Sequence, residues 1–304
     1  MRYSNHAIGV ILVIIATLLL SFRSILVKWA YIEQVSVMGL FYYRFLFTVP
    51  LLLMVSFYKK GRLLFTTIAT GPIFIGCFSA GFFGYYLATF FDFHSLYLID
   101  ASVNRLIVYT FPMYVLIIHS MIKKKRPSVR DILVFVLVQI GLFFVLGGRY
   151  MFFASIDRWG VLFAWIAAMS YAIYIVINQE VANKIGSILF TTYAVTCSFI
   201  LINIHFFSVP HLGTGMVTLS VKAYLIILVM AIFCTFLPLL LISEGIKRIG
   251  APTFSLISST GPIMTICFAV MFLSETMTIQ QIMGAVLVIG MLYVSEKWFI
   301  QGSH

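Results

Sequence analysis

Residues 101–112 read Ala-Ser-Val-Asn-Arg-Leu-Ile-Val-Tyr-Thr-Phe-Pro. Residues 251–262, 150 positions later, read Ala-Pro-Thr-Phe-Ser-Leu-Ile-Ser-Ser-Thr-Gly-Pro. Five pairs of positions hold the same residue: Ala101 and Ala251, Leu106 and Leu256, Ile107 and Ile257, Thr110 and Thr260, Pro112 and Pro262. A second match joins Gly9, Val10 and Ala16 to Gly160, Val161 and Ala167 at nearly the same offset. The chain is therefore expected to consist of two related halves, residues 1–150 and 151–304.

Both halves are almost wholly apolar. Hydrophobic residues make up 62% of the chain and charged residues 10%, whereas soluble domains carry about 25% charged residues. A soluble fold of this size cannot bury so much apolar surface, so lipid must be the solvent for most of it. The composition predicts an all-α integral membrane protein whose first partner is the lipid bilayer.

Ten apolar runs are long enough to cross about 30 Å of hydrocarbon, and short loops separate them. They cover residues 7–29, 35–58, 66–90, 96–121, 129–147, 158–178, 188–209, 219–243, 250–273 and 279–299. Five spans fall in each half. Two halves with an odd number of spans must enter the membrane from opposite sides, which predicts two inverted five-helix repeats.

Basic residues set the expected orientation. The net charge of +11 would suggest nucleic acid in a soluble protein, but here lysines and arginines gather in loops, so no nucleic-acid partner is expected. One side of the membrane holds 13 of them, including Lys123–Arg126, and the other side holds 4. The positive-inside rule then places both termini in the cytoplasm, most simply at a bacterial cytoplasmic membrane.

Several short pieces, in this order, resemble the EamA-type branch of the drug/metabolite transporter superfamily across almost the whole chain. They are Ser21–Lys28, Arg44, Tyr86–Thr89 with Asp92-Phe93, Arg105–Ile107 with Pro112, Glu244–Ala251, Gly261-Pro262 and Ser274-Glu275. The resemblance implies ten helices, with helices 1, 3, 4, 6, 8 and 9 around a central cavity, and small organic solutes as substrates. Relatives often carry Glu before the helix 4 arginine, where this chain has Asn104, so this chain lacks the acid of that pair.

Three arginines, Arg23, Arg44 and Arg105, lie at membrane depth in the outer half of their spans. A charged group there costs ~2.5–3.5 kcal/mol on insertion scales, so each one marks a functional hypothesis. We expect a cationic vestibule that attracts a carboxylate, which the planar guanidinium binds through two hydrogen bonds. The alternative is internal neutralisation, in which Arg44 or Arg105 pairs with Asp92 or Asp100 and Arg23 extends to the surface.

Polar residues on the spans expected at the centre complete the predicted substrate site. They are Asn104, Tyr109, Ser24, Tyr85, Tyr86, Tyr171, Tyr174 and Asn178. Each of them can equally be a packing residue with an internal hydrogen bond. Pro112 and Pro262 remove a helical hydrogen bond at matching places, which predicts either a hinge or a static bend.

The sequence favours a secondary transporter of small solutes, present as a monomer or homodimer, over a membrane-embedded enzyme or a non-catalytic partner protein. No HExxH, Walker A or Ser–His pattern occurs, so no catalytic residue, metal or cofactor is expected. No acidic residue falls near a span centre, which indicates a facilitator, an exchanger, or coupling through another group. His119 is the histidine inside a span, and it is either a proton carrier or an interfacial residue.

Overall fold

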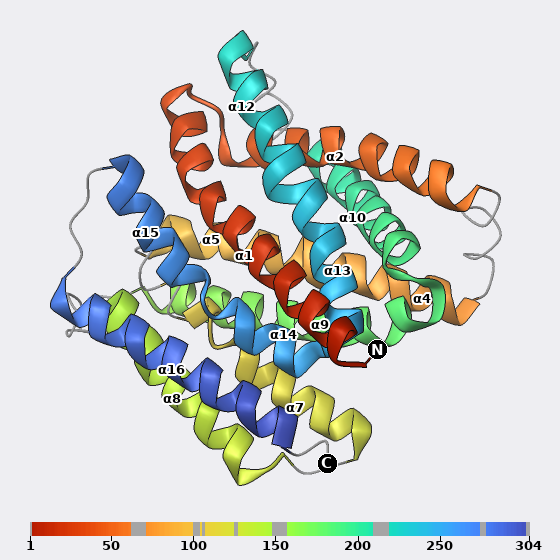
Figure 1. Ribbon diagram of the computed structural model, residues 1–304. Helices are drawn as coiled ribbons and strands as arrows, with labels where there is room; N and C mark the ends of the chain where they lie inside the picture. Colours follow the sequence, from red (N-terminus) through yellow and green to blue (C-terminus); the bar gives the residue numbers. More distant parts are fainter. Residues whose placement is uncertain are drawn as a thin grey trace. The chain divides into compact units, whose positions relative to one another are not determined.

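The computed structural model describes residues 2–61, 71–99, 104, 107–124, 127–147, 157–208, 219–273 and 278–301, and these form helices joined by short turns, with no strand among them (Figure 1). The helices group into two compact units. The first unit contains residues 1–87 and 177–250, and the second contains residues 88–176 and 251–304. Each unit therefore takes helices from both halves of the sequence.

The first unit contains α1 (Arg2–Ile32), α2 (Val37–Lys60), α4 (Gly71–Ala80), η2 (Gly81–Leu87), α10 (Ser187–Ser208), α12 (Val221–Ala231), η4 (Ile232–Phe236) and α13 (Leu237–Ile249). The second contains α5 (Ala88–Leu98), α7 (Phe111–Lys123), α8 (Val129–Gly147), α14 (Ala251–Ser258), α15 (Gly261–Leu273) and α16 (Ile279–Gln301). Helix α9 (Arg158–Ile185) is divided between them after Val176.

Six of these helical stretches are long and apolar enough to cross a membrane, and two shorter apolar helices accompany them. Large apolar side chains such as Ile11, Met54 and Ile200 are more than half exposed, as expected for groups that face lipid. Several helices are longer than the apolar runs predict. Helix α9 continues to Ile185 and α13 to Ile249, in each case through charged and polar residues that follow the apolar run.

In the first unit, α1 packs along α13, and α10 packs against α2, η2 and α13. Small residues permit the close contact of α1 with α13. A Cβ atom added to Gly245 would lie 2.5 Å from Cγ2 of Val13, and one added to Gly9 would lie 2.5 Å from Cγ2 of Ile249. Association of helices in lipid depends on such close packing. Lipid tails are as apolar as the helix surfaces, so no hydrophobic driving force brings the helices together.

Two π-helical segments interrupt long helices at matching places in the two halves. Segment η2 begins at Gly81, between α4 and α5, and η4 begins at Ile232, between α12 and α13. Gly81 contacts the backbone of α10, since an added Cβ would collide with the carbonyl oxygen of Ala194. In η4, the Thr235 hydroxyl donates to the carbonyl of Met230, five residues back, at 3.2 Å. Such segments often occur at functional sites.

An ion pair joins the end of α1 to the start of α12. Nζ of Lys222 lies 2.7 Å from Oε1 of Glu33, and the Ser220 hydroxyl, which caps α12, donates to Oε2 of Glu33 at 2.9 Å. The hydrogen bond from Lys222 contributes most to lowering the pKa of Glu33 below its ordinary value, and the bond from Ser220 adds to it. Glu33 follows the last residue of α1, outside the membrane-spanning stretch.

We therefore expect the Glu33 link to weaken at acidic pH. A carboxylate whose pKa is lower in the folded state stabilises the fold above its unfolded pKa, and this contribution is lost as pH falls through the folded pKa. Because the pair is exposed, the effect should be small and decrease with salt. Thermal unfolding of the wild type and Glu33→Gln in detergent should show a gap in midpoint near pH 7 that narrows at an acidic pH, as Glu33 becomes protonated in the folded state. An equal gap at both pH values would contradict this role.

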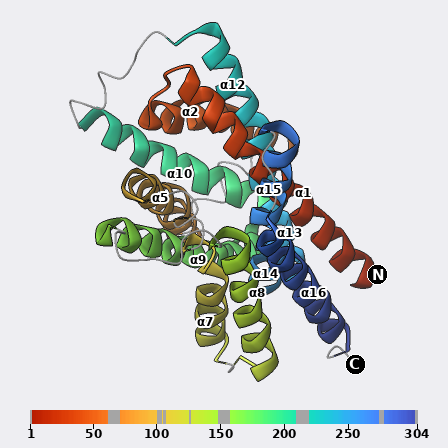
Figure 2. The same ribbon diagram turned by 90° about the vertical axis from the view of Figure 1, so that its left-hand side faces the viewer.

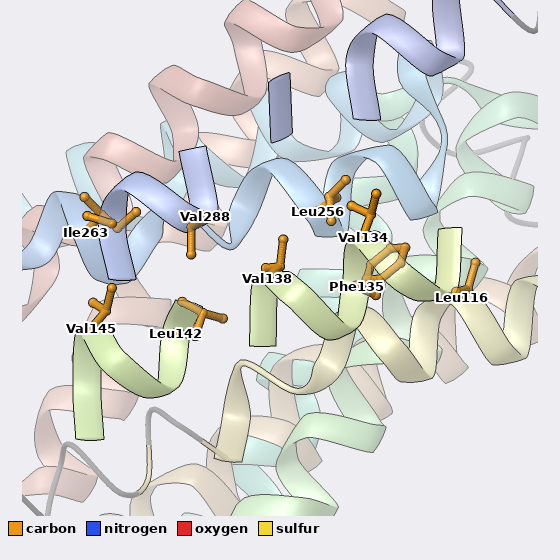
Figure 3. Packing of buried hydrophobic residues seen from close by; sticks show 10 residues of the cluster. Leu116, Val134, Phe135, Val138, Leu142, Val145, Leu256, Ile263 and Val288 are labelled. Atoms are coloured by element: carbon orange, nitrogen blue, oxygen red, sulfur yellow. The ribbon is translucent and has the colours of Figure 1, made fainter. Parts of the chain in front are cut away.

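In the second unit, α16 packs along α8 (Figures 1 and 2). The buried cluster in this unit takes Leu116 from α7, Val138 and Leu142 from α8, Leu256 from α14 and Val288 from α16 (Figure 3). Gly141 and Gly284 bring the backbones of α8 and α16 together, because a Cβ atom added to Gly284 would lie 2.5 Å from the carbonyl oxygen of Gly141.

Candidate functional site

Two of the three predicted arginines lie in the first unit. Arg23 lies on α1 and Arg44 on α2, and both guanidinium groups lie close enough to the Cys234 thiol of η4 to act on it electrostatically. Arg44 is 6% exposed and Cys234 is 1% exposed. We call Arg23, Arg44 and Cys234 the arginine site. The sequence identified both arginines, but it gave no indication that they would converge on a cysteine in a distant helix.

Aromatic rings surround the Arg44 guanidinium. Its central carbon lies 5.0 Å from the ring centroid of Phe45 and 5.7 Å from that of Phe41. A cation held over aromatic faces is stabilised by about 0.5–2 kcal/mol and keeps its charge. The Phe45 ring in turn packs edge to face against Tyr85 of η2, with centroids 6.4 Å apart. Arg44 is thus linked through Phe45 to Tyr85, a second residue of the predicted substrate site.

Helix α2 also contacts the other π-helical segment. The Thr48 hydroxyl, one turn after Arg44, donates to the Arg44 carbonyl at 2.7 Å and lies 3.4 Å from the carbonyl of Ala231, the residue before η4. Thr48 is fully buried. Cys234 of η4 is part of the arginine site, and Tyr85 of η2 packs against Phe45 beside it. Both interrupted helices therefore lie next to the arginine site.

Tyr86, the neighbour of Tyr85, forms a different contact. Its hydroxyl lies 3.0 Å from Nδ1 of His205 on α10. The sequence placed His205 among scattered histidines at span ends and did not connect it with Tyr86. The pair joins η2 to α10 by a hydrogen bond, which fixes the direction in which the Tyr86 hydroxyl points.

Three further predicted residues meet in the second unit. The Phe111 ring packs against Tyr171 of α9, with centroids 5.1 Å apart and planes at 80°, and lies 6.1 Å from Tyr109. Tyr171 in turn lies 5.6 Å from Tyr174 on the next turn of α9. Tyr109, Tyr171 and Tyr174 therefore form an aromatic row with Phe111 at its centre, a residue that sequence reasoning missed. Tyr174 is 1% exposed, whereas Tyr171 is partly accessible.

The helices that carry Pro112 and Pro262 are both interrupted. Turn residues 109–110 precede α7, and turn residues 259–260 separate α14 from α15. The two breaks lie 150 residues apart and have the same local bonds, since Thr110 and Thr260 each donate a backbone and a side-chain hydrogen bond to the carbonyl three residues earlier. The helices are therefore interrupted close to Pro112 and Pro262. That these interruptions act as hinges remains a prediction.

Two predicted amide residues are fully buried and hydrogen bonded. The Asn104 amide donates to the Ser95 hydroxyl at 3.0 Å in the second unit. The Ser243 hydroxyl of α13 donates to Oδ1 of Asn178 on α9, also at 3.0 Å, in the first unit. Neither residue joins the arginine site or the aromatic row through these contacts. Arg105 and the side chain of Ser24 lie outside the described residues, so their placement stays a prediction.

Among the residues that the structure describes, no group of three His, Cys, Asp or Glu side chains gathers in a way that could hold a metal ion. Cys77, Cys197 and Cys234 are buried, and Cys267 is exposed. The arginine site contains two guanidinium groups. Guanidinium groups keep their positive charge in an apolar setting and offer planar pairs of N–H donors.

Comparisons with known proteins agree with this architecture. The model of the EamA-like transporter family matches residues 7–147 and again residues 158–295. The uncharacterized transporter YcbK of Bacillus subtilis (strain 168) is 29% identical over 290 residues, which cover 93% of this chain and 91% of that protein. The uncharacterized transporter YdfC of the same organism is 24% identical over 192 residues, 63% of this chain and 61% of that protein.

A solved crystal structure of a protein has the same fold. It is 17% identical to this chain, with a TM-score of 0.76, and the similarity covers 97% of both chains. The two family matches fall one in each half of the sequence and together span most of it. The chain therefore belongs to the EamA-like transporter family of the drug/metabolite transporter superfamily and is an integral membrane transporter.

Proposed function

We propose that the protein is a secondary transporter for a small organic solute that carries a carboxylate, such as an amino acid or another carboxylate-bearing metabolite. The observation that supports this substrate class is that two arginines, Arg23 and the buried Arg44, lie within electrostatic range of the buried Cys234 thiol in an apolar helical unit. A positive charge inside a span is costly and attracts an anion strongly. A carboxylate that binds beside Arg44 would be attracted by Arg23 as well.

The buried surroundings favour this assignment. A charge–charge attraction is several times stronger near a partly buried site than in water, because the effective dielectric constant is lower. The guanidinium fork matches the two oxygens of a carboxylate in geometry as well as in charge. Thr48 lies one turn after Arg44 on α2 and bonds its backbone carbonyl, and Tyr85 packs against the Phe45 ring, so both polar residues lie on the elements around Arg44.

The proposed mechanism is alternating access without catalysis. The helix breaks before α7 and between α14 and α15 lie at matching places in the two repeats, where Pro112 and Pro262 act as hinges. The two repeats are inverted, both termini lie in the cytoplasm of a bacterial cell, and the protein is a monomer or homodimer. Labelling of terminal tags from one side of the membrane tests the orientation, and tags on opposite faces would contradict it.

The substrate class is tested by uptake into proteoliposomes. A panel of labelled amino acids and organic anions is compared with the matching carboxamides, with and without a pH gradient. We expect carboxylates to enter and carboxamides to be poor competitors, and recovered solute to be chemically unchanged. Equal competition by carboxamides would refute the carboxylate assignment, and solute that is consumed without crossing would indicate an enzyme. Uptake that ignores the pH gradient would identify a facilitator or an exchanger.

A further inference from the structure

The break between α14 and α15 leaves a backbone acceptor without its usual donor. In a continuous helix the N–H of residue 262 would bond to the carbonyl of Ser258, but Pro262 has no N–H. Helix α14 ends at Ser258 and α15 starts at Gly261. The carbonyls at the C-terminal end of a helix carry partial negative charge. The break therefore presents acceptor groups inside the second unit.

Side-chain hydroxyls at this break donate their protons to backbone carbonyls. Ser255 donates to the carbonyl of Pro252 at 2.8 Å, Ser259 donates to the carbonyl of Ser255 at 3.2 Å, and Thr260 donates to the carbonyl of Ile257 at 2.9 Å. A hydroxyl has one proton and two lone pairs. Since the protons of these three groups point to backbone carbonyls, only their lone pairs remain for a ligand.

One more hydroxyl at the break has no partner. Ser258 is 9% exposed, and its Oγ is buried without a hydrogen bond to any described residue. A buried hydroxyl left unbonded costs about 1–3 kcal/mol, so it indicates an absent ligand or water. Ser255 and Ser259 are fully buried. Ser258 therefore lies within a buried group of hydroxyls that offer lone pairs.

The matching break in the first half has a different arrangement. There the amide of Gln139 on α8 donates to the carbonyl of Tyr109 at 2.9 Å, so a side chain of the protein satisfies an acceptor at the break. At the same offset the corresponding carbonyl in the second half is that of Ser259, and the residue that corresponds to Gln139 is Ile289, whose side chain has no hydrogen-bond donor. The positions that correspond to Ser255, Ser258 and Ser259 are Arg105, Val108 and Tyr109. Among the described residues, the second break therefore combines several hydroxyls with the unpartnered Oγ of Ser258.

Packing holds both sides of this break. Leu256, two residues before Ser258, and Ile263, just after Pro262, belong to the same buried cluster with Val138 and Leu142 of α8 (Figure 3). The hydroxyls and carbonyls between Leu256 and Ile263 are therefore held at a fixed place, as a binding site requires.

We propose that the α14–α15 break is a binding site for a small monovalent cation, with Oγ and the carbonyl oxygen of Ser258 as ligands and the neighbouring hydroxyls in support. Interrupted helices bind Na⁺ through such carbonyl and hydroxyl oxygens. The cation is either inorganic, as Na⁺, or the ammonium group of the solute. The Na⁺ assignment goes beyond the proposed function, and the ammonium assignment rests on it.

Thermal unfolding of the purified full-length protein in detergent tests the site without requiring transport. Sodium chloride and methylammonium chloride are each compared with N-methyl-D-glucamine chloride at equal ionic strength. A cation that binds the folded state should raise the midpoint by roughly 2–4 °C at several times its Kd. Ser258→Ala should remove this rise, and Ser258→Thr should retain it. If Ser258→Ala does not fold, Ser259→Ala is used in its place.

Ser198→Ala is the matched control, because Ser198 also has a buried, unpartnered hydroxyl but lies on α10 in the first unit. It should respond to cations as the wild type does. A Ser258-dependent rise with Na⁺ supports an inorganic cation, and a Ser258-dependent rise with methylammonium alone supports the ammonium group. No rise with either cation, or a rise that survives Ser258→Ala, overturns the proposal. Because no uptake is measured, failure here leaves the carboxylate site to its own test.

Discussion

Replacement of Arg44 by glutamine should raise the KM for uptake of carboxylate-bearing solutes by about 30-fold or more. Loss of one partner of a buried charged pair typically costs about 2–5 kcal/mol, and each 1.4 kcal/mol is a factor of about ten. Arg44 is 6% exposed over the rings of Phe41 and Phe45, so a solute bound there is largely shielded from water. Initial rates of uptake into proteoliposomes, measured over a range of solute concentrations, give the KM.

The control variants separate binding from folding. Lys59→Gln removes a positive charge from the exposed last turn of the same helix and should leave the KM unchanged. Arg44→Lys keeps the charge but loses the planar fork, so its KM should lie between those of the wild type and Arg44→Gln. Arg23→Gln should resemble Arg44→Gln, because both groups act on the same site. Full uptake by Arg44→Gln at wild-type KM would show that Arg44 is structural and that the carboxylate binds elsewhere.

Gly284→Val should strongly destabilise the second unit. An added Cβ would lie 2.5 Å from the carbonyl oxygen of Gly141, 2.7 Å from the amide nitrogen of Val145 and 2.9 Å from Cβ of Phe144. Two of these atoms are backbone, so the helices must separate to admit a side chain. Overpacking costs about 1–3 kcal/mol and sometimes more, which corresponds to a fall of roughly 5–10 °C in the unfolding midpoint.

Gly290→Ala is the matched control for Gly284. Gly290 lies on the same helix, α16, and nothing lies within 4 Å of the Cβ atom that alanine would add. Alanine favours the helical backbone by about 0.5–1 kcal/mol over glycine, so this variant should be neutral or slightly more stable. Equal midpoints for the two variants would show that α8 and α16 do not approach each other as described.

The membrane class, the repeated organisation and the helix breaks could be predicted from the sequence because each has a local cause. Hydropathy determines which segments enter lipid, and a proline removes one backbone donor wherever it stands. The breaks occur beside Pro112 and Pro262 for this reason. Helices α9 and α13 extend past the predicted apolar runs, through polar residues such as Lys184 and Arg248.

The candidate site was predicted only in its components. The cost of burying a charge in lipid marks Arg23 and Arg44 as candidate residues in the sequence. Their placement within electrostatic range of Cys234 depends on how α1, α2 and η4 pack. Cys234 itself was interpreted as a small core residue, which its burial supports. The π-helical segments had no local signal, since a shifted hydrogen-bond register depends on contacts such as that of Gly81 with α10. Asn178 was placed among cavity residues, and the structure gives it an internal bond to Ser243.

The paired π-helical segments also fall at equivalent positions of the two repeats. Gly81 and Ile232, the first residues of η2 and η4, lie 151 positions apart, which is also the spacing of Gly9 and Gly160. Such segments are rare and often occur at functional sites. The equal spacing is explained most simply if both repeats inherited the segment from one ancestral sequence.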